Sequence, residues 1–246
     1  MLPIRDHNPS LRVPYVTYAL MAANILIFLI GLVVLQSQVQ IAQFYFDYAL
    51  IPARFAAGEN AMALVTSIFL HAGFLHLAGN MMFLWIFGDN LEEQMGHLPF
   101  LFFYLFCGAG ASLAQYLSDP GSLVPVVGAS GAIAGVMGGY LLLYPKARVD
   151  IFVFLLVYFR IIPIPAWLML ALWFGLQLFN GIGADSANGG VAHWAHAGGF
   201  IVGFVAAIPY WLRLGGPRFW QKTLGRPDHP QADYCLLYTS PSPRDA

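Results

Sequence analysis

The segment VGASGAIAGVMGGYLLLY, residues 127–144, decides the fold of this chain. It runs for 18 residues without a charged side chain and includes five glycines. An uncharged apolar stretch of this length is typical of a helix that crosses a membrane. Small residues at intervals of three or four allow the backbones of two such helices to approach closely. The segment therefore predicts a transmembrane helix that packs tightly against a neighbour.

The composition of the whole chain excludes a water-soluble globule. Of the 246 residues, 59% are hydrophobic and 9% are charged, and the mean hydropathy is +0.68. A soluble domain carries about 25% charged residues. The net charge is −1 and lysine and arginine form no cluster, which argues against a nucleic-acid partner. The two cysteines, Cys107 and Cys235, cannot build a disulfide framework or a zinc site by themselves.

Six segments are long and apolar enough, or nearly so, to cross the hydrocarbon core of a bilayer. They are Tyr15–Leu35, Leu75–Met95, Leu98–Leu117, Val127–Tyr144, Ile164–Phe179 and Gly190–Leu212. The run Ile151–Phe159 is apolar but only nine residues long, and Arg160 and two prolines follow it. We expect this run to be interfacial, as a lead-in to the fifth helix. The sequence thus predicts an all-α membrane protein, a bundle of six transmembrane helices.

The basic residues set the expected orientation, since they concentrate on the cytoplasmic side of membrane proteins. With the N-terminus inside, the inner segments carry nine basic residues and the outer segments carry only Arg54. Both termini are therefore expected in the cytoplasm. The loop Gln36–Thr66 between the first two spans is then external. Its apolar and aromatic residues predict that it lies against the surface of the membrane.

Three regions follow from these spans. Residues 1–213 are expected to form the transmembrane domain, and residues 214–234 a cytoplasmic tail. The run CLLYTSPSPRD, Cys235–Asp245, continues nothing before it, and its back-translation resembles a transposase sequencing adapter. We therefore interpret residues 235–246 as an artefact to be left out of fold reasoning. The alternative is an ordinary disordered tail rich in serine and proline.

Polar side chains within the spans are few, and such groups are costly in lipid and point to function. They gather at the outer starts of the second, fourth and sixth spans: His71, His76, Asn80, Ser130, His193 and His196. His76 and Asn80 are four residues apart and share one helical face. Both offer N–H donors of the kind that an oxyanion needs. His71, five residues before His76, should point elsewhere on an ideal helix.

Ser130 and His196 lie at the outer end of one seam of small residues. The seam glycines on the fourth and sixth spans are Gly128, Gly131, Gly135, Gly199 and Gly203. Without side chains at these positions, the two helices can pack closely enough for Ser130 to reach His196. Packing alone does not explain why a serine and a histidine stand at the same end of the seam.

These motifs together resemble the rhomboid family of intramembrane serine proteases. The resemblance rests on HAGFLHLAGN at residues 71–80, on Gly88 and Glu92, on GASG at residues 128–131, and on AHAGG at residues 195–199 with Gly203. It covers roughly residues 15–212, including the number of spans and the order of the motifs. Each piece alone is weak, but the full set in this order is specific.

The resemblance implies a serine endopeptidase that cleaves transmembrane helices of membrane proteins near the outer face. Ser130 would be the nucleophile and His196 the general base, in a dyad without a catalytic acid. His76, Asn80 and the backbone N–H of Ser130 would bind the oxyanion, and the fifth span would be the lateral gate for the substrate. No metal and no other cofactor is implied, and the partners are transmembrane protein substrates and the lipid bilayer. The compact chain points to the inner membrane of a bacterium.

The sequence departs from the family pattern at three places. Some bacterial members have a tyrosine, four residues after the serine, that stacks on the catalytic imidazole. This chain has Ala134 there, so another group must orient His196. Met62 and Ala63 stand where many members have Trp-Arg, which bears on the anchoring of the external loop. His193 is a second histidine near His196, and we take His196 as the base because it alone lies in the motif beside the seam.

Three other functions compete with a protease. His71, His76, His193 and His196 could bind a metal, but the His-Glu-x-x-His motif of helical zinc proteases is absent. A catalytically inactive rhomboid-like protein could bind membrane clients, but the presence of both Ser130 and His196 argues against it. A transporter would show two similar halves with broken helices, and the sequence contains no such repeat.

Overall fold

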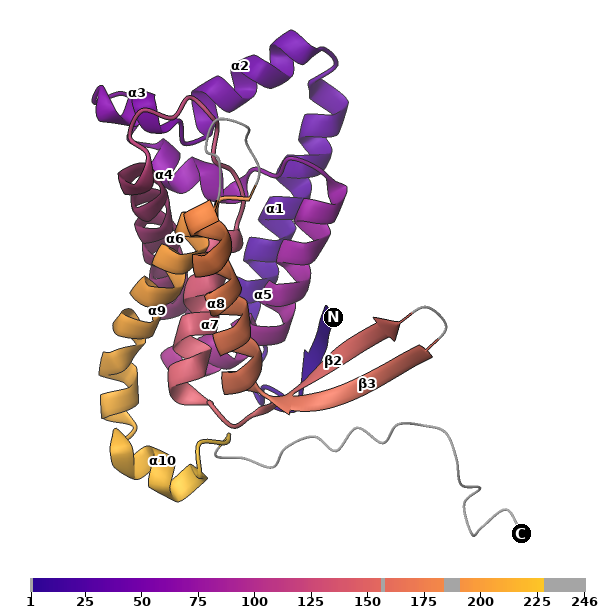
Figure 1. Ribbon diagram of the computed structural model, residues 1–246, viewed down its shortest axis with the longest axis vertical. Coiled ribbons are helices and arrows are strands. Elements are labelled where there is room, and N and C mark those ends of the chain that lie inside the picture. The colour runs from indigo at the N-terminus through magenta and orange to yellow at the C-terminus, as the bar shows by residue number, and fades with distance from the viewer. Residues whose placement is uncertain (1, 156–157, 184–190, 228–246) are drawn as a thin grey trace.

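The computed structural model describes residues 2–155, 158–183 and 191–227, and it is built mainly of helices (Figure 1). Its elements, in chain order, are β1 (Leu2–Asp6), α1 (Tyr15–Val34), α2 (Gln38–Tyr48), α3 (Pro52–Ala56), α4 (Ala63–Thr66), η1 (Ser67–Phe69), α5 (Phe74–Met95), α6 (His97–Ser118), α7 (Ser130–Leu143), β2 (Arg148–Leu155), β3 (Tyr158–Pro165), α8 (Ala166–Gly183), α9 (His193–Arg213) and α10 (Pro217–Thr223). The predicted artefact, residues 235–246, and the end of the predicted tail lie outside the described residues.

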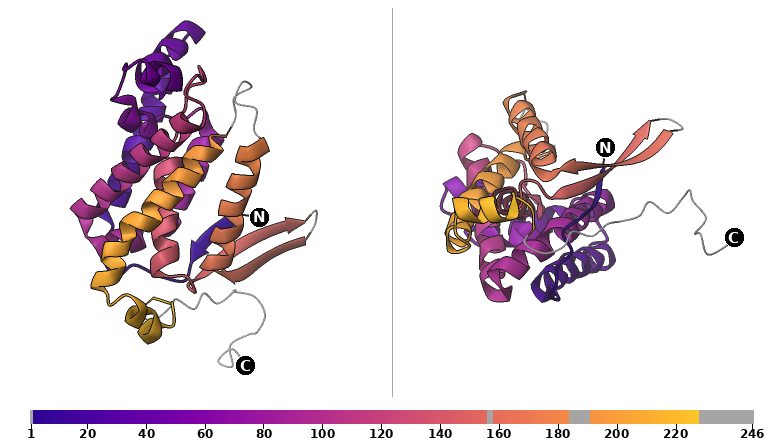
Figure 2. Two further views of the ribbon diagram at one scale, coloured as in Figure 1. Left: turned by 60° about the vertical axis from the view of Figure 1, so that its left-hand side comes forward. Right: turned by 90° about the horizontal axis from the view of Figure 1, so that it is seen from below.

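Helix α7 is the centre of the bundle. It packs against α5, α6, α8 and α9, and its contact with α9 is the most extensive between any two described elements (Figures 1 and 2). Twelve of its 14 residues are buried. A helix that is apolar on all sides is stable only when other elements cover it. The segment that decides the fold therefore also forms the core.

Three of the described helices, α1, α6 and α9, are long and apolar enough to cross a membrane. A fourth span results if the segment Ala63–Phe69 and α5 are taken together, with a bend of 97° between them. Helices α7 and α8 are apolar but shorter than a full span of about 20 residues. The structure is thus a helical bundle suited to a membrane, and the count of six spans stays a prediction.

The expectation of an all-α chain is wrong, because three strands form an antiparallel sheet in the order β1-β2-β3. The run that was expected to be interfacial, Ile151–Phe159, falls mostly in β2. Its aromatic and β-branched residues favour a strand, and the two prolines stand in β3, an edge strand, where proline is tolerated. Arg5 of β1 pairs with Asp150 of β2, 145 residues further along the chain. No local pattern could indicate such a pairing.

A buried hydrogen bond joins this sheet to the helical bundle, and an ion pair joins two of its strands. Tyr140 of α7 donates its hydroxyl to the carboxylate of Asp6 in β1 at 2.7 Å. Asp150 of β2 pairs with the guanidinium of Arg5 at 2.7 Å. Burial, together with the nearby charge of Asp89, raises the pKa of Asp6 well above its usual value. The first strand is therefore fixed to the central helix by a buried acid.

Glu92 of α5 takes the place of a cap at the start of α1. Its carboxylate accepts hydrogen bonds from the backbone N–H groups of Val16 at 2.8 Å and Thr17 at 2.7 Å, and from the Thr17 hydroxyl at 2.7 Å. The first N–H groups of a helix have no partner within the helix, and Pro14 before α1 offers no side-chain cap. Glu92 is 1% exposed, so these bonds join α1 to α5 inside the protein.

The loop Gln36–Thr66 lies at the end of the bundle opposite the sheet (Figure 1). It is folded into α2, α3 and α4, and Ser37 and Gln40 form a reciprocal cap at the start of α2. Leu50 exchanges two backbone hydrogen bonds with Val126, of 3.2 and 2.8 Å, which hold the loop against the segment leading into α7. The contact of this loop with a bilayer stays a prediction.

Candidate active site

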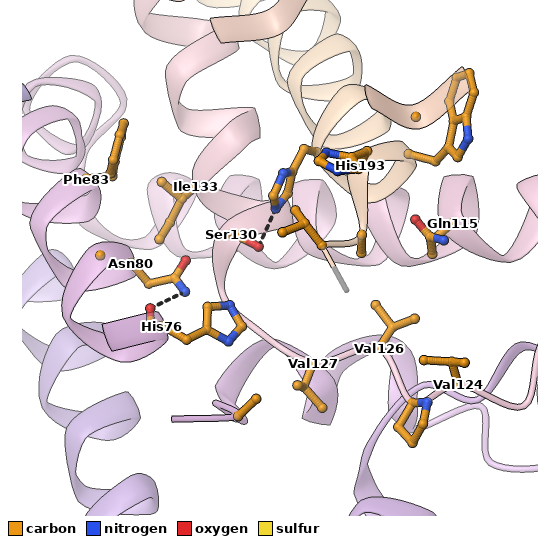
Figure 3. Close-up of a pocket in the computed structure, with 18 of the residues that line it drawn as sticks. His76, Asn80, Phe83, Gln115, Val124, Val126, Val127, Ser130, Ile133 and His193 are labelled. Atoms are coloured by element: carbon orange, nitrogen blue, oxygen red, sulfur yellow. Dashed lines mark hydrogen bonds between the residues drawn. The ribbon is translucent and has the colours of Figure 1, made fainter. Parts of the chain in front are cut away.

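Ser130 and His196, far apart in the sequence, meet at the loop end of the bundle. Ser130 is the first residue of α7, and His196 stands in the first turn of α9. The Oγ of Ser130 and the Nε2 of His196 are 2.7 Å apart, in a hydrogen bond that Figure 3 marks at Ser130. This is the distance expected between a nucleophile and its general base.

Four of the five seam glycines lie where α7 and α9 touch: Gly131, Gly135, Gly199 and Gly203. Gly128 precedes α7 and lies against His76 of α5, so its assignment to the seam is wrong. A Cβ atom at Gly199 would overlap the carbonyl oxygen of Gly131, and one at Gly203 would overlap the carbonyl oxygen of Gly135. Any larger residue would push the two helices apart, because the atoms in the way belong to backbone. Since Ser130 and His196 stand at the starts of these helices, the seam also sets the distance between them.

Gly128 brings the chain close to His76 just before α7. Its φ of +125° lies in the region that favours glycine. A Cβ atom at this position would lie 2.8 Å from the His76 ring, closer than van der Waals contact allows. Gly128 therefore allows the imidazole of His76 to lie against the turn that enters α7.

His76 and Asn80 of α5 line the same cavity as Ser130 and His196 (Figure 3). The Nδ2 of Asn80 donates to the carbonyl oxygen of His76 at 2.8 Å. This bond uses one of the two N–H groups of the amide. The structure thus brings together the four side chains that the sequence analysis selected.

Ideal helical geometry predicts that His71 points away from His76, and this prediction is wrong. Helix α5 begins at Phe74, so His71 precedes the helix and ideal helical spacing does not apply to it. Its ring packs edge-on against the ring of His76, with 5.2 Å between the centroids. His71 is 6% exposed and forms part of the packing around His76.

His193 and His196 share one partner, Gln177 of α8. The Oε1 of Gln177 lies 3.0 Å from the Nδ1 of His193 and 2.8 Å from the Nδ1 of His196. Of these two rings, that of His196 makes the hydrogen bond with Ser130. The geometry therefore favours His196 over His193 as the partner of the serine. Within the described residues, no three or more histidine, cysteine or acidic side chains are grouped so that they could hold a metal ion.

A cavity of about 670 Å³ opens beside Ser130 and His196. Its apolar walls include Leu75, Phe83, Ile133, Met137 and Trp173. None of the described residues that line it is Asp, Glu, Lys or Arg. An apolar cavity with a few converging polar groups is typical of a substrate-binding site.

Sequence reasoning missed two amide side chains that the structure places at the site. Gln115 of α6 accepts a hydrogen bond at 3.1 Å from the backbone N–H of Ala195, one of the first N–H groups of α9. Gln177 of α8 contacts both imidazoles described above. Each glutamine stands in an otherwise apolar span, and that isolation is the signal that could have found it.

Comparison with known proteins identifies the family. The model of the rhomboid domain matches residues 58–213. The chain belongs to the rhomboid family. It is 30% identical over 190 residues to the mitochondrial Rhomboid protein 1 of Saccharomyces cerevisiae, covering 76% of this chain and 50% of that protein. It is 32% identical over 171 residues to the Rhomboid protease GluP of Bacillus subtilis, covering 66% of this chain and 30% of that protein.

A third relative is the chloroplastic Rhomboid-like protein 11 of Arabidopsis thaliana, 46% identical over 72 residues, which are 29% of this chain and 25% of that protein. The chain spans half or less of the length of these three relatives. Family and apolar helices together identify an integral membrane protein of the intramembrane-protease family. The relatives come from mitochondria and chloroplasts as well as from a bacterium, so they do not support the expected bacterial inner membrane over an organelle membrane.

Proposed function

We propose that this rhomboid is a serine endopeptidase that cleaves transmembrane helices of membrane proteins near the outer face of the membrane. Ser130 is the nucleophile and His196 the general base. The observation that carries the proposal is the 2.7 Å hydrogen bond between Ser130 Oγ and His196 Nε2 beside an apolar cavity. A serine hydroxyl becomes an effective nucleophile when an adjacent base accepts its proton.

The reaction follows from these positions. Ser130 Oγ attacks the carbonyl carbon of the scissile peptide bond as His196 Nε2 takes its proton. The protonated imidazole then donates that proton to the leaving amine, and an acyl-enzyme remains on Ser130. Water enters the cavity, gives a proton to His196 and attacks the ester, which releases the second product and restores the hydroxyl.

The oxyanion is stabilised by three groups around the serine. The backbone N–H of Ser130 is the first of α7, so it has no acceptor within the helix and lies at the positive end of the helix dipole. His76 and Asn80 stand across the cavity on α5 and can present N–H donors to the same oxygen. An N–H donor stabilises a negatively charged oxygen most strongly in a site from which bulk water is excluded.

The substrate reaches the cavity from the lipid, and α8 is the gate. One face of α8 packs against α9, whereas Leu172, Leu176 and Phe179 on α8 are exposed. Displacement of this helix opens the cavity sideways without disturbing the packing of α7 on α9. The carbonyl groups of an intact helix are hydrogen-bonded, so the substrate must unwind locally before Ser130 can attack it.

Cleavage of a single-span substrate in detergent micelles tests the proposal. Wild type, Ser130→Ala, His196→Ala and His193→Ala are compared, together with labelling by a serine-reactive fluorophosphonate. We expect wild type and His193→Ala to cut and to be labelled, and the other two variants to do neither. Labelling without cleavage would leave the nucleophile in place but the substrate unidentified. Neither cleavage nor labelling of wild type would overturn the proposal in favour of an inactive protein that binds membrane clients.

A further inference from the structure

The imidazole of His196 meets an amide where the serine-protease triad has a carboxylate. The Oε1 of Gln177 accepts a hydrogen bond from its Nδ1–H at 2.8 Å. Gln177 is 9% exposed, and it stands on α8 while His196 stands on α9. A buried amide of this kind can orient an imidazole without adding charge to the site.

The two hydrogen bonds of His196 determine where its ring proton lies. To take the proton of Ser130, Nε2 must carry a lone pair, so the single proton of the neutral ring is on Nδ1. That Nδ1–H needs an acceptor, and Gln177 supplies a carbonyl oxygen. In the opposite tautomer, Nε2 carries the proton and cannot act as the base.

His193 determines which end of the Gln177 amide faces the dyad. An amide side chain can turn over, which would present its NH₂ group where the oxygen now lies. The Oε1 of Gln177 also lies 3.0 Å from the Nδ1 of His193, and a carbonyl oxygen has two lone pairs for two donors. When both Nδ1 atoms carry the ring proton, turning the amide would break both bonds. The second histidine therefore favours the orientation that the base requires.

Helix α8 also places an aromatic ring beside the imidazole. Trp173 precedes Gln177 by four residues, so both stand on one face of the helix. The ring centroids of Trp173 and His196 are 5.7 Å apart, with 33° between the planes. The two α8 side chains thus contact the imidazole at its edge and its face. They supply the support that Ala134 of α7 lacks the side chain to give.

We propose that Gln177 is a positioning residue that holds His196 in the tautomer able to act as the base, and that this orientation depends on α8 lying against α9. The inference rests on the proposed function. Because Gln177 and the base stand on different helices, any outward displacement of α8 separates them. The dyad is therefore fully able to react only when α8 lies against α9.

The first test replaces Gln177 by leucine, which has a similar size but accepts no hydrogen bond. The full chain in detergent micelles is assayed for cleavage of a single-span substrate and for the rate of fluorophosphonate labelling, which needs an activated serine but no substrate helix. We expect kcat and the labelling rate of Gln177→Leu to fall about 10- to 100-fold with KM unchanged, the size of loss seen when a metal-binding histidine loses the hydrogen-bond partner that orients it. Gln43→Leu, the same substitution at an exposed position of α2 away from the cavity, is the matched control and should match wild type.

The second test uses the pH dependence of labelling by Gln177→Glu. The titratable side chains that line the cavity among the described residues are His76, His193 and His196, so a carboxylate at position 177 would be a new charge there. It keeps an acceptor for Nδ1–H and stabilises the protonated imidazolium. We therefore expect an active variant whose acid limb moves to higher pH by about one unit or more.

The outcomes separate this inference from the proposed function. If wild type neither cuts nor labels, the proposed function fails. If wild type is active and Gln177→Leu is equally active, only the role of Gln177 is overturned. Should Gln177→Leu fail to fold, as judged by thermal unfolding, Gln177→Glu decides, and an unchanged pH profile in that variant contradicts the inference.

Discussion

The backbone of Gly199 in α9 lies directly against the carbonyl group of Gly131 in α7, with no side chain between them. Gly203 of α9 meets the carbonyl group of Gly135 in α7 in the same way, and both contacts lie further along the two helices than the hydrogen bond between Ser130 and His196. The same feature that packs the core therefore also positions the site.

Replacing Gly199 by alanine should damage stability and activity together. The added Cβ would overlap a backbone oxygen, which cannot move aside as a flexible side chain can. Overpacking of this kind costs about 1–3 kcal/mol of unfolding free energy. Thermal unfolding in detergent and fluorophosphonate labelling are the measurements, and both should fall below wild type. The matched control is Gly175→Ala on α8, where nothing lies within 4 Å of the new Cβ, and a stability equal to that of Gly199→Ala would contradict the expectation.

Glu92→Ala should loosen the start of α1. The substitution leaves two backbone N–H groups and the Thr17 hydroxyl without their buried acceptor. Each unsatisfied buried group costs about 1–3 kcal/mol, so we expect a clear fall in the thermal midpoint. Glu93→Ala is the control, since Glu93 accepts from the exposed Leu11 N–H and should contribute little. Equal midpoints for the two variants would show that Glu92 does not hold α1.

The sequence predicts those parts of the site that local patterns encode. The glycine spacing of α7 and α9 indicates their close contact, and Ser130 and His196 stand at fixed positions along that spacing. The sheet could not be predicted, because β1 pairs with a strand about 145 residues away. The apolar run in β2 also lacks the alternation that distinguishes a half-buried strand from other apolar segments.

Two details of the site depend on tertiary structure. The prediction that His71 points away from His76 requires one helix to contain both residues. Helix α5 begins only at Phe74, so the turn before it brings the two rings into contact. Gln177 was overlooked because its role depends on how α8 is rotated against α9. Its isolation in an apolar span indicates a polar side chain turned away from lipid, but the sequence does not say that its partners are His193 and His196.

The buried acid Asp6 should make stability depend on pH. Its pKa is raised by burial and by the charge of Asp89, so the folded chain binds this proton more tightly than the unfolded chain. The contribution of Asp6 to the free energy of unfolding is therefore complete below about pH 4, the pKa of an unfolded aspartate. It is lost as the pH rises through the raised pKa of Asp6 in the folded chain. We expect the thermal midpoint of wild type to fall over that range, and that of Asp6→Asn, which resembles the protonated acid, to fall less. Asp47→Asn in the exposed part of α2 should follow the wild-type curve, and an identical curve for Asp6→Asn would contradict this role.

Asn80 should act on the transition state and not on the binding of the substrate. The N–H that Asn80 has left after its bond to the His76 carbonyl is available to the oxyanion, which exists only as the reaction proceeds. Loss of one such donor lowers kcat about 10²- to 10³-fold, so Asn80→Ala should show that loss with KM nearly unchanged. Phe83→Leu is the contrast, because Phe83 lines the same cavity without an N–H group and should change KM more than kcat. If Asn80→Ala raised KM and spared kcat, Asn80 would belong to substrate binding, and the oxyanion would depend on His76 and the Ser130 backbone alone.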